Sequence, residues 1–533
     1  MSILSSVQYD IAAAVGLLFV VVFIAQTIYS VYFGPLSKFP GPKLAAATLC
    51  YEFYYDVVLK GQYTFKIKDL HKEYGPIIRI SPYELHVDDP DYYEELYSSH
   101  KPRNRYAFFV AQFGLPGSTF STVDYKFHRG RRAAISPFFS KQNINKLEPM
   151  MSHMVEKLCG RIDQCRKAGV IMEMQSVYMC LTTDIITLYA MNRSWNYLDD
   201  PDFSPFWVDT MHGVIQTAAL AKYFPWILPL TQALPLSLIR AMHPGMAMLF
   251  DFQHKVQDDT QKVIDGEYKS SQEQRDLGMD KTIIHALLES NLPEEEKAHS
   301  RIWQEGQVVI GAGADTTAAT IVITHFHILD NPHVLQKLRL ELVAAIPDPL
   351  LPARLSIVER LPYLNAVVQE GLRLSYGALG RLQRSHPFEA MKFHDWEIPA
   401  GTPVGMSSYL MHHNEEIFPD SFAFKPERWL ESRPEGAPPL DRYLVAFSKG
   451  SRQCVGMKFV APFSPITIDC GNTTDDAKPS LARAEINLTL ATVFRRFDKQ
   501  QLYETSRLDV DAKYDFLLPQ PSMESKGIRV LFE

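Results

Sequence analysis

One cysteine, Cys454, lies in a frame of residues that restricts its surroundings more than any other segment of the chain. Its neighbours read Phe447-Ser-Lys-Gly450-Ser-Arg452-Gln-Cys454-Val-Gly456. The two glycines permit a tight turn and the close approach of a flat ligand. The guanidinium of Arg452 suits an anionic group such as a carboxylate. Backbone N–H groups turned toward the sulfur would favour its thiolate form, so the segment predicts a metal ligand.

The composition excludes several classes of protein. Six cysteines are few for 533 residues and include no CxxC pair, so neither a zinc ribbon nor a disulfide scaffold is expected. The body of the chain is therefore predicted to lie in a reducing compartment. The net charge of −7 argues against a nucleic-acid-binding protein. Small buried hydrophobic residues are the interpretation for Cys50, Cys159, Cys165 and Cys180.

The N-terminal segment predicts a membrane anchor. Residues 11–33 contain no charged side chain and provide enough helix to span ~30 Å of hydrocarbon. No lysine or arginine precedes this run, whereas Lys38 and Lys43 follow it, which favours a cytoplasmic body with residues 1–10 on the lumenal side. A buried core helix and a cleaved signal peptide are the alternatives. The run lacks a basic leader and is longer than a typical signal core, so we prefer the anchor.

The rest of the chain reads as one large domain, mainly α with a minor β part. Residues 34–45 are predicted to form a stiff hinge, because two prolines in Phe39-Pro40-Gly41-Pro42 restrict φ and end the helix. No linker is apparent within residues 46–533. The long stretch 303–329 is apolar on nearly all faces, which predicts a buried helix. Further helices are expected at 143–164, 172–191, 334–346, 364–374 and 481–497, and short strands at 77–80 and 402–410.

Three further motifs place polar groups in unusual positions. Ala312-Gly313-Ala314-Asp315-Thr316-Thr317 lies midway along the predicted buried helix, where an acid and hydroxyls are costly without partners or a function. Glu370 and Arg373 are three residues apart and share a helix face. His128 and Arg132 begin and end a basic segment. The alternatives are a helix N-cap at the acid, a surface ion pair and a solvated basic turn.

These motifs together resemble those of the cytochrome P-450 superfamily. The cysteine segment matches the superfamily pattern FxxGxRxCxG at every fixed position, and the resemblance extends from the proline hinge to Phe497. It implies a cytochrome P-450 fold in which Cys454 ligates the iron of haem b. A thiolate ligand on haem iron favours cleavage of the O–O bond. The residues that the resemblance assigns to haem binding are His128, Arg132, Ala312, Arg384, Phe447, Arg452 and Gly456.

The resemblance also implies catalytic and structural residues. Asp315 and Thr316 are the implied catalytic pair, which delivers protons while dioxygen is activated. Arg428, in Phe424-Lys-Pro-Glu-Arg-Trp429, is implied to complete a cluster with Glu370 and Arg373. Buried charges of this kind are tolerated only when they are fully paired, so we interpret the cluster as a structural lock.

The implied function is a monooxygenase that hydroxylates or epoxidises a lipophilic small molecule with O2. Tyr51-Glu-Phe-Tyr-Tyr-Asp56 and Ile80-Ser-Pro-Tyr-Glu-Leu-His86 resemble the fungal secondary-metabolism branch that contains trichodiene oxygenase. A terpenoid substrate is therefore favoured, and a polyketide-derived substrate is the alternative. Substrate walls are expected at 106–122, 310–317 and 377–382, which are largely apolar.

The resemblance further implies partners and a location. Electrons are expected from NADPH through NADPH-cytochrome reductase, with cytochrome b5 as a second donor. The enzyme is expected in the endoplasmic reticulum membrane as a single-pass protein with a cytoplasmic catalytic domain. Arg129, Arg131 and Lys449 are predicted to form the basic surface that docks the acidic reductase.

The chain departs from the superfamily pattern after Met457. The pattern continues Cys-x-Gly-x-x-Leu-Ala-x-x-Glu, whereas here residues 458–480 separate Met457 from Leu481-Ala-Arg-Ala-Glu485. A long loop without structure is unexpected in a compact domain. We therefore interpret 458–480 as a retained intron. If the working protein contains this insertion, an inactive haem binder is the alternative function. A non-oxygenating haem-thiolate isomerase or dehydratase is the other, against which the Asp315-Thr316 pair argues.

Overall fold

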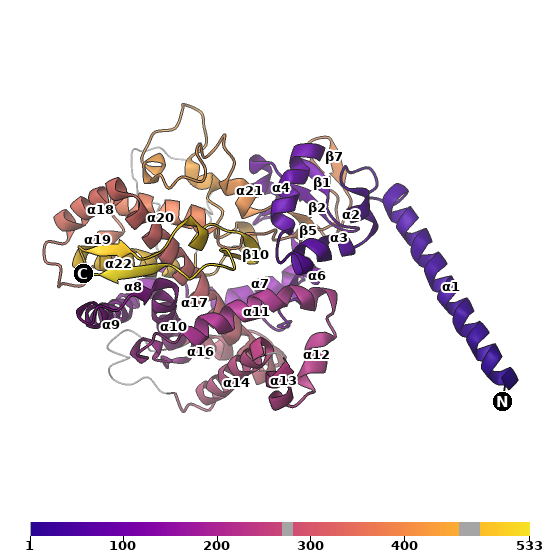
Figure 1. Cartoon of the computed structure of the whole chain (residues 1–533), viewed down its shortest axis with the longest axis horizontal. Helices are drawn as coiled ribbons and strands as arrows, with labels where there is room; N and C mark the ends of the chain where they lie inside the picture. Colours follow the sequence, from indigo (N-terminus) through magenta and orange to yellow (C-terminus); the bar gives the residue numbers. More distant parts are fainter. Residues whose placement is uncertain (1, 243, 269–280, 458–479) are drawn as a thin grey trace.

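Figure 1 shows a mostly helical body from which one long N-terminal helix projects. The computed structural model describes every residue except 1, 243, 269–280 and 458–479. Its many helices and small sheets confirm the predicted mainly α class with a minor β part. The predicted insertion lies outside the described residues, apart from Ser480, whose side chain caps the following helix.

The central helices are buried on almost every side. α17 (His299–Asp330) is the long helix predicted at 303–329, and it packs along α10 (Met174–Met191). α20 (Pro362–Ser375) and α22 (Leu481–Arg496) pack against α17 as well. A helix that is apolar on nearly all faces, as α17 is, is stable only inside a protein, and the other three helices bury most of their residues around it.

The largest sheet joins segments that are far apart in the sequence. Its strand order is β1-β2-β8-β5-β3, with β1 at Ile77–Arg79, β2 at Leu85–Val87, β8 at Val404–Gly405, β5 at Arg384–Ser385 and β3 at Asn104–Arg105. β1 falls within the strand predicted at 77–80. β5 pairs antiparallel with β3, so Arg384 lies directly opposite Arg105. This register brings two arginines together that are remote in sequence.

The helix predicted at 143–164 is instead two helices. α8 (Lys141–Lys146) ends before α9 (Glu148–Lys167) begins. Pro149 lies in the first turn of α9, where its missing N–H is tolerated. The same proline cannot donate the hydrogen bond that would continue α8, so the chain starts a new helix.

The strand predicted at 402–410 is wrong over most of its length. Only β8 forms there, and α21 (Ser408–His412) follows it. The Ser407 side chain accepts a hydrogen bond from the backbone N–H of Tyr409, which caps the helix and stops the strand.

The remaining elements surround this core. The helices are α2 (Lys43–Ala47), α3 (Cys50–Phe53), α4 (Tyr63–Tyr74), α5 (Tyr93–Leu96), α6 (Ala107–Ala111), α7 (Tyr125–Ile135), α11 (Pro205–Tyr223), α12 (Ile227–Gln232), α13 (Leu236–Met242), α14 (Pro244–Ile264), α16 (Ile283–Glu289), α18 (Pro332–Ala345) and α19 (Leu355–Val358). The strands are β4 (Met172–Glu173), β6 (Met391–Phe393), β7 (Trp396–Ile398), β9 (Gln500–Leu502), β10 (Tyr514–Phe516), β11 (Leu518–Gln520) and β12 (Arg529–Phe532). Cys159 and Cys180 are buried as predicted, whereas Cys165 is half-buried and Cys50 is exposed.

The N-terminal helix α1 (Ser2–Tyr32) is tied to the body at its C-terminal end. Its stretch Ala13–Tyr32 is long and apolar enough to cross a membrane. The buried guanidinium of Arg79 donates to the Ser30 carbonyl and to Ser30 Oγ, both at 2.8 Å. Phe39, in the predicted hinge, is buried and stacks on Trp396 with ring centroids 5.0 Å apart. The segment after α1 therefore packs on the body.

Candidate active site

The cysteine segment forms a tight turn directly after a short 3-10 helix, Gly450–Arg452. The N–H of Cys454 donates to the carbonyl of Phe447 at 3.0 Å. Gly450 has φ +75°, and a Cβ there would overlap the Tyr97 carbonyl, so only glycine fits. Among the described residues, a Cβ at Gly456 would meet only the Cys454 sulfur, at 3.6 Å.

The Cys454 side chain stays accessible although protein atoms surround it. Burial raises the pKa of its thiol. Hydrogen bonds from the backbone at Gly456 and Met457 and the charge of Arg132 act in the opposite direction. An iron ion bound to the sulfur would reinforce these contributions, since metal coordination deprotonates a thiol outright.

Buried cations gather close to the cysteine segment. Burial, followed by repulsion from Arg384, Arg452 and Arg132, holds the pKa of Arg105 well below its usual range. Burial and the same arginines, Arg452 foremost among them, lower the pKa of His128 to about 2, so its imidazole is neutral. Within the described part of the chain, no carboxylate forms an ion pair with any of these four arginines.

Several donors of this cationic cluster (Arg105, Arg132, Arg384 and Arg452) have no partner. Nε and Nη1 of Arg105 and Nη2 of Arg384 are buried without a hydrogen bond in the described structure. Uncompensated buried charge is costly, so the cluster requires an anion. A haem bears two propionates, and these residues therefore fit that group.

The other two arginines of the cluster bind backbone carbonyls. Arg132 donates through Nη1 to Gln453 O at 2.6 Å and through Nη2 to Cys454 O at 3.4 Å. Arg452 donates to the carbonyls of Arg103, Thr122 and Val123 at 2.6–3.1 Å. Both side chains thus fasten the cysteine segment to residues 103–132.

Arg105 was not among the residues predicted from the sequence. Neither its spacing nor a local motif distinguishes it, because its position depends on the β3–β5 register with Arg384. We expect Arg105→Leu to lower haem affinity about tenfold or more, since a hydrogen bond to a charged group is worth ~1.5–3 kcal/mol. The rate of haem transfer to apomyoglobin measures this effect.

The exposed arginine on α7 provides a matched control for this prediction. Arg129→Leu removes the same charge without touching the cluster, and its haem transfer rate should equal that of the wild type. Equal transfer rates for the Arg105→Leu variant and the wild type would show that Arg105 does not hold a propionate.

The middle of α17 presents an accessible face. Ala312 is exposed and Thr316 is half-buried, although most of their neighbours on the helix are buried. Thr316 Oγ1 donates to the Ala312 carbonyl at 2.7 Å. A Cβ at Gly313 would lie 2.7 Å from Ile186 Cγ1. Gly313 therefore serves the close packing of α10 against α17.

Asp315 points away from the Thr316 face. It is buried, and Gln175 Nε2 on α10 donates to its Oδ1 at 3.3 Å. Its Oδ2 has no partner among the described residues. Burial raises the pKa of this carboxyl, opposed by His212. The raised pKa favours the protonated form of this carboxyl, which can then donate its proton.

Glu370, Arg373 and Arg428 lie together as one buried cluster. Arg373 makes a two-pronged contact with Glu370, at 2.9 Å from Nε and 2.8 Å from Nη2. Arg428 Nε donates to Glu370 Oε1 at 3.1 Å, and Trp429 Nε1 donates to Oε2 at 2.9 Å. The remaining Arg373 donors reach the carbonyls of residues 412, 421 and 423. Every charge in this cluster has a partner.

The predicted basic docking surface is largely occupied by ion pairs. Arg131 binds Glu296 at 2.7 and 2.8 Å, and Lys449 binds Glu94 at 2.7 Å. Arg129 is exposed, and the described structure gives its side chain no ion pair. Two of the three cations are therefore already neutralised by carboxylates of this chain.

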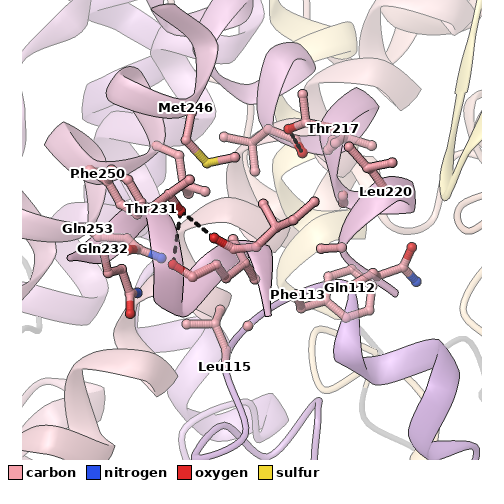
Figure 2. A pocket seen from close by; sticks show the side chains of 18 of the residues that line it. Gln112, Phe113, Leu115, Thr217, Leu220, Thr231, Gln232, Met246, Phe250 and Gln253 are labelled. Carbon is pink, nitrogen blue, oxygen red and sulfur yellow. Dashed lines mark hydrogen bonds between the residues drawn. The ribbon is translucent and has the colours of Figure 1, made fainter. Parts of the chain in front are cut away.

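A cavity of about 280 Å³ lies between α11, α12, α13 and α14 (Figure 2). Residues 112–115, from the first predicted wall, line it, and Gln307 of α17 closes one side. The segments 310–317 and 377–382 do not contribute to its lining. Apolar side chains dominate the walls, which is the character expected of a site for a lipophilic molecule.

A mainly helical fold, an accessible cysteine and a cluster of arginines with unpaired donors agree with a haem-thiolate protein. Comparison with known proteins agrees. The family model described as Cytochrome P-450 matches residues 42–461. The chain is 46% identical to a cytochrome P-450 monooxygenase of Ascocoryne sarcoides, with 95% of each chain covered. It is 39% identical to tryptophan 6-hydroxylase of Fusarium equiseti, covering 98% of this chain and 97% of that protein.

The chain belongs to the cytochrome P-450 family. A third relative, N-acetyltryptophan 6-hydroxylase of Emericella nidulans, is 37% identical over 93% of this chain and 92% of its own. The protein is accordingly a haem-dependent monooxygenase that takes electrons from a reductase and acts on a lipophilic substrate.

Proposed function

We propose that Cys454 holds the haem iron and that Asp315 and Thr316 supply protons during hydroxylation or epoxidation of a neutral lipophilic molecule. The proposal rests on the cationic cluster. Its unpaired donors lie close to the accessible cysteine and would bind the two propionates of a haem. His128, Arg132, Ala312, Arg384, Phe447, Arg452 and Gly456 are proposed to surround that group. Glu370, Arg373 and Arg428 are proposed to stabilise the fold and not to take part in catalysis.

Bound haem would supply the activation of dioxygen. The side chains of α17 would hold and transfer the protons. Thr316 Oγ1 holds its proton on the Ala312 carbonyl across the accessible face of the helix. Asp315, buried against Gln175, is a carboxyl whose raised pKa suits repeated proton transfer. The two side chains lie on different faces of α17, so Asp315 does not donate directly to Thr316.

A fungal terpenoid remains the substrate class that we favour, with a polyketide-derived molecule as the alternative. Two relatives are named for hydroxylating tryptophan or N-acetyltryptophan. The described lining of this cavity offers no charged side chain to an ammonium or carboxylate group. Burying such a charge unpaired is costly, so a free amino acid fits this cavity poorly.

We further propose that α1 anchors the enzyme in the endoplasmic reticulum membrane with the catalytic domain, 46–533, in the cytoplasm and residues 1–10 in the lumen. NADPH-cytochrome reductase and cytochrome b5 are the proposed electron donors. Residues 458–480 are proposed to be a retained intron. The family match supports this, because it ends at residue 461, within the first residues of that segment.

The proton-delivery proposal is tested with Thr316→Ala in microsomes that contain NADPH-cytochrome reductase, with farnesol as the probe. We expect product carrying one added oxygen to fall at least tenfold per NADPH consumed, with hydrogen peroxide rising in its place, because general acid catalysis contributes ~10²–10⁴-fold. Liquid chromatography with mass detection and a peroxide assay measure the two yields.

Thr317→Ala is the matched control, since Thr317 is the next residue but is buried away from the accessible face. Its product yield per NADPH should match the wild type. An unchanged yield in Thr316→Ala would remove Thr316 from the proton path.

A further inference from the structure

The polar groups of the cavity between α11 and α14 are few. Among the described residues, its lining contains no acidic, basic or histidine side chain. Two threonines and four glutamines contribute the only side-chain polar atoms of the described lining. The hydrogen-bond partners of these six residues decide what kind of ligand the cavity can accept.

Both threonine hydroxyls are satisfied within their own helices. Thr231 Oγ1 donates to the carbonyls of Ile227 and Leu228, each at 2.9 Å (Figure 2). Thr217 Oγ1 donates to the Gly213 and Val214 carbonyls at 2.9 and 3.1 Å. Neither hydroxyl needs a ligand.

The four glutamines divide into two that are more exposed and two that are largely buried. Gln232 is exposed and Gln112 is half-buried, so water reaches both. Gln253 of α14 is only 8% exposed and Gln307 of α17 only 7% exposed. The described structure gives neither of these two carboxamides a hydrogen bond, and Gln307 Oε1 is fully enclosed.

Two largely buried carboxamides in an apolar wall are unfavourable unless a ligand or water pairs with them. A hydrocarbon would leave both unpaired. A charged group would lack a counter-ion. A hydroxyl both donates and accepts, so it pairs with a carboxamide in either orientation of the amide. A neutral lipophilic alcohol therefore meets the demands of this cavity.

We propose that Gln253 and Gln307 are specificity-determining residues that bind a hydroxyl group of the substrate, so that the enzyme acts on a lipophilic alcohol. This inference rests on the proposed function, because it takes the cavity ligand to be the substrate. It places the enzyme after a reaction that supplies an alcohol, such as an earlier hydroxylation or the release of a prenyl alcohol.

The position of Gln307 also predicts which end of the substrate is bound. Gln307 precedes Thr316 by nine residues of α17, which is ~13 Å along the helix axis. The bound hydroxyl would therefore lie far from the reacting carbon. The new oxygen should enter the substrate at the end remote from the existing hydroxyl.

Equilibrium dialysis of the full-length holoenzyme tests the proposal with three probes of one carbon skeleton: farnesol, farnesyl methyl ether and the hydrocarbon farnesene. The wild type should bind farnesol about tenfold more tightly than farnesene, with the ether in between. Gln253→Leu and Gln307→Leu should each reduce that preference several-fold, and the double variant should abolish it. Gln232→Leu makes the same substitution on the hydrated rim and should leave the preference unchanged.

Farnesene binding as tight as farnesol binding in the wild type would overturn the proposal, and this comparison needs no variant to fold. A preference that survives in the double variant, shown to be folded by an unchanged reduced carbon-monoxide spectrum, would overturn it too. Dialysis requires no turnover. A failure of oxygen insertion would therefore count against the proposed function. The dialysis result would still test the binding of the hydroxyl group on its own.

Discussion

Cys454→Ser is expected to abolish both the thiolate-type Soret band of the reduced carbon-monoxide complex and all oxygen insertion. A serine hydroxyl does not ionise near neutral pH, and its oxygen is a harder ligand than sulfur. The electron donation that favours O–O cleavage is therefore lost even if haem stays bound. The reduced carbon-monoxide difference spectrum of the purified variant measures the first effect, and product formation with NADPH and reductase measures the second.

Two further cysteine variants serve as controls for this prediction. Cys50→Ser changes an exposed cysteine and should preserve the band. Cys470 lies in the predicted insertion, so a band that persists in Cys454→Ser and disappears in Cys470→Ser would contradict our assignment.

The same spectrum tests whether residues 458–480 belong to the working protein. Protein that lacks residues 458–480 should show a stronger thiolate-type band than the full chain. The main transcript should also lack the corresponding codons. A main transcript that retains them would refute the intron hypothesis.

Arg373→Met is expected to lower the free energy of unfolding by about 3–5 kcal/mol, because it leaves a buried carboxylate without its main partner. Arg373 and Glu370 are both 0% exposed, so water cannot replace the lost contacts. The substitution also leaves the carbonyls of His412, Ser421 and Ala423 without their donor. Denaturant unfolding followed by haem absorbance gives the free energy.

A surface ion pair provides the comparison. Lys72 and Asp69 form a bridge at 2.8 Å with both side chains more than 60% exposed. Lys72→Met should change stability by less than about 0.5 kcal/mol, as is usual for exposed pairs. A similarly small effect of Arg373→Met would show that the buried cluster does not stabilise the fold.

The parts of this protein that can be predicted from its sequence are those whose residues are close together in the chain. The cysteine segment and the long apolar helix are continuous stretches, and their residue types alone indicate what they do. The Glu370–Arg373 pair is also local, since a helix places residues three apart on one face. Arg428 needed the family resemblance, because it comes from a separate segment.

The residues that escaped prediction depend on contacts between distant segments. Arg105 joins the cationic cluster through strand register, and the role of Gly313 depends on how closely α10 approaches α17. Gln253 and Gln307 lie on different helices, so only the folded chain shows that they line one cavity. The break between α8 and α9 was missed although Pro149 was visible in the sequence, because the apolar spacing continues across it.

The contact between Arg79 and Ser30 has a consequence for how the enzyme meets its electron donor. A flexible connection between α1 and the body would let the catalytic domain rotate relative to the bilayer. Only some of its encounters with the reductase would then have a productive orientation. Here the last turn of α1 is fixed to the first strand of the sheet by two hydrogen bonds to a buried guanidinium. With α1 spanning the membrane as proposed above, this attachment would restrict the tilt of the catalytic body, and a membrane-bound reductase would meet it in fewer orientations.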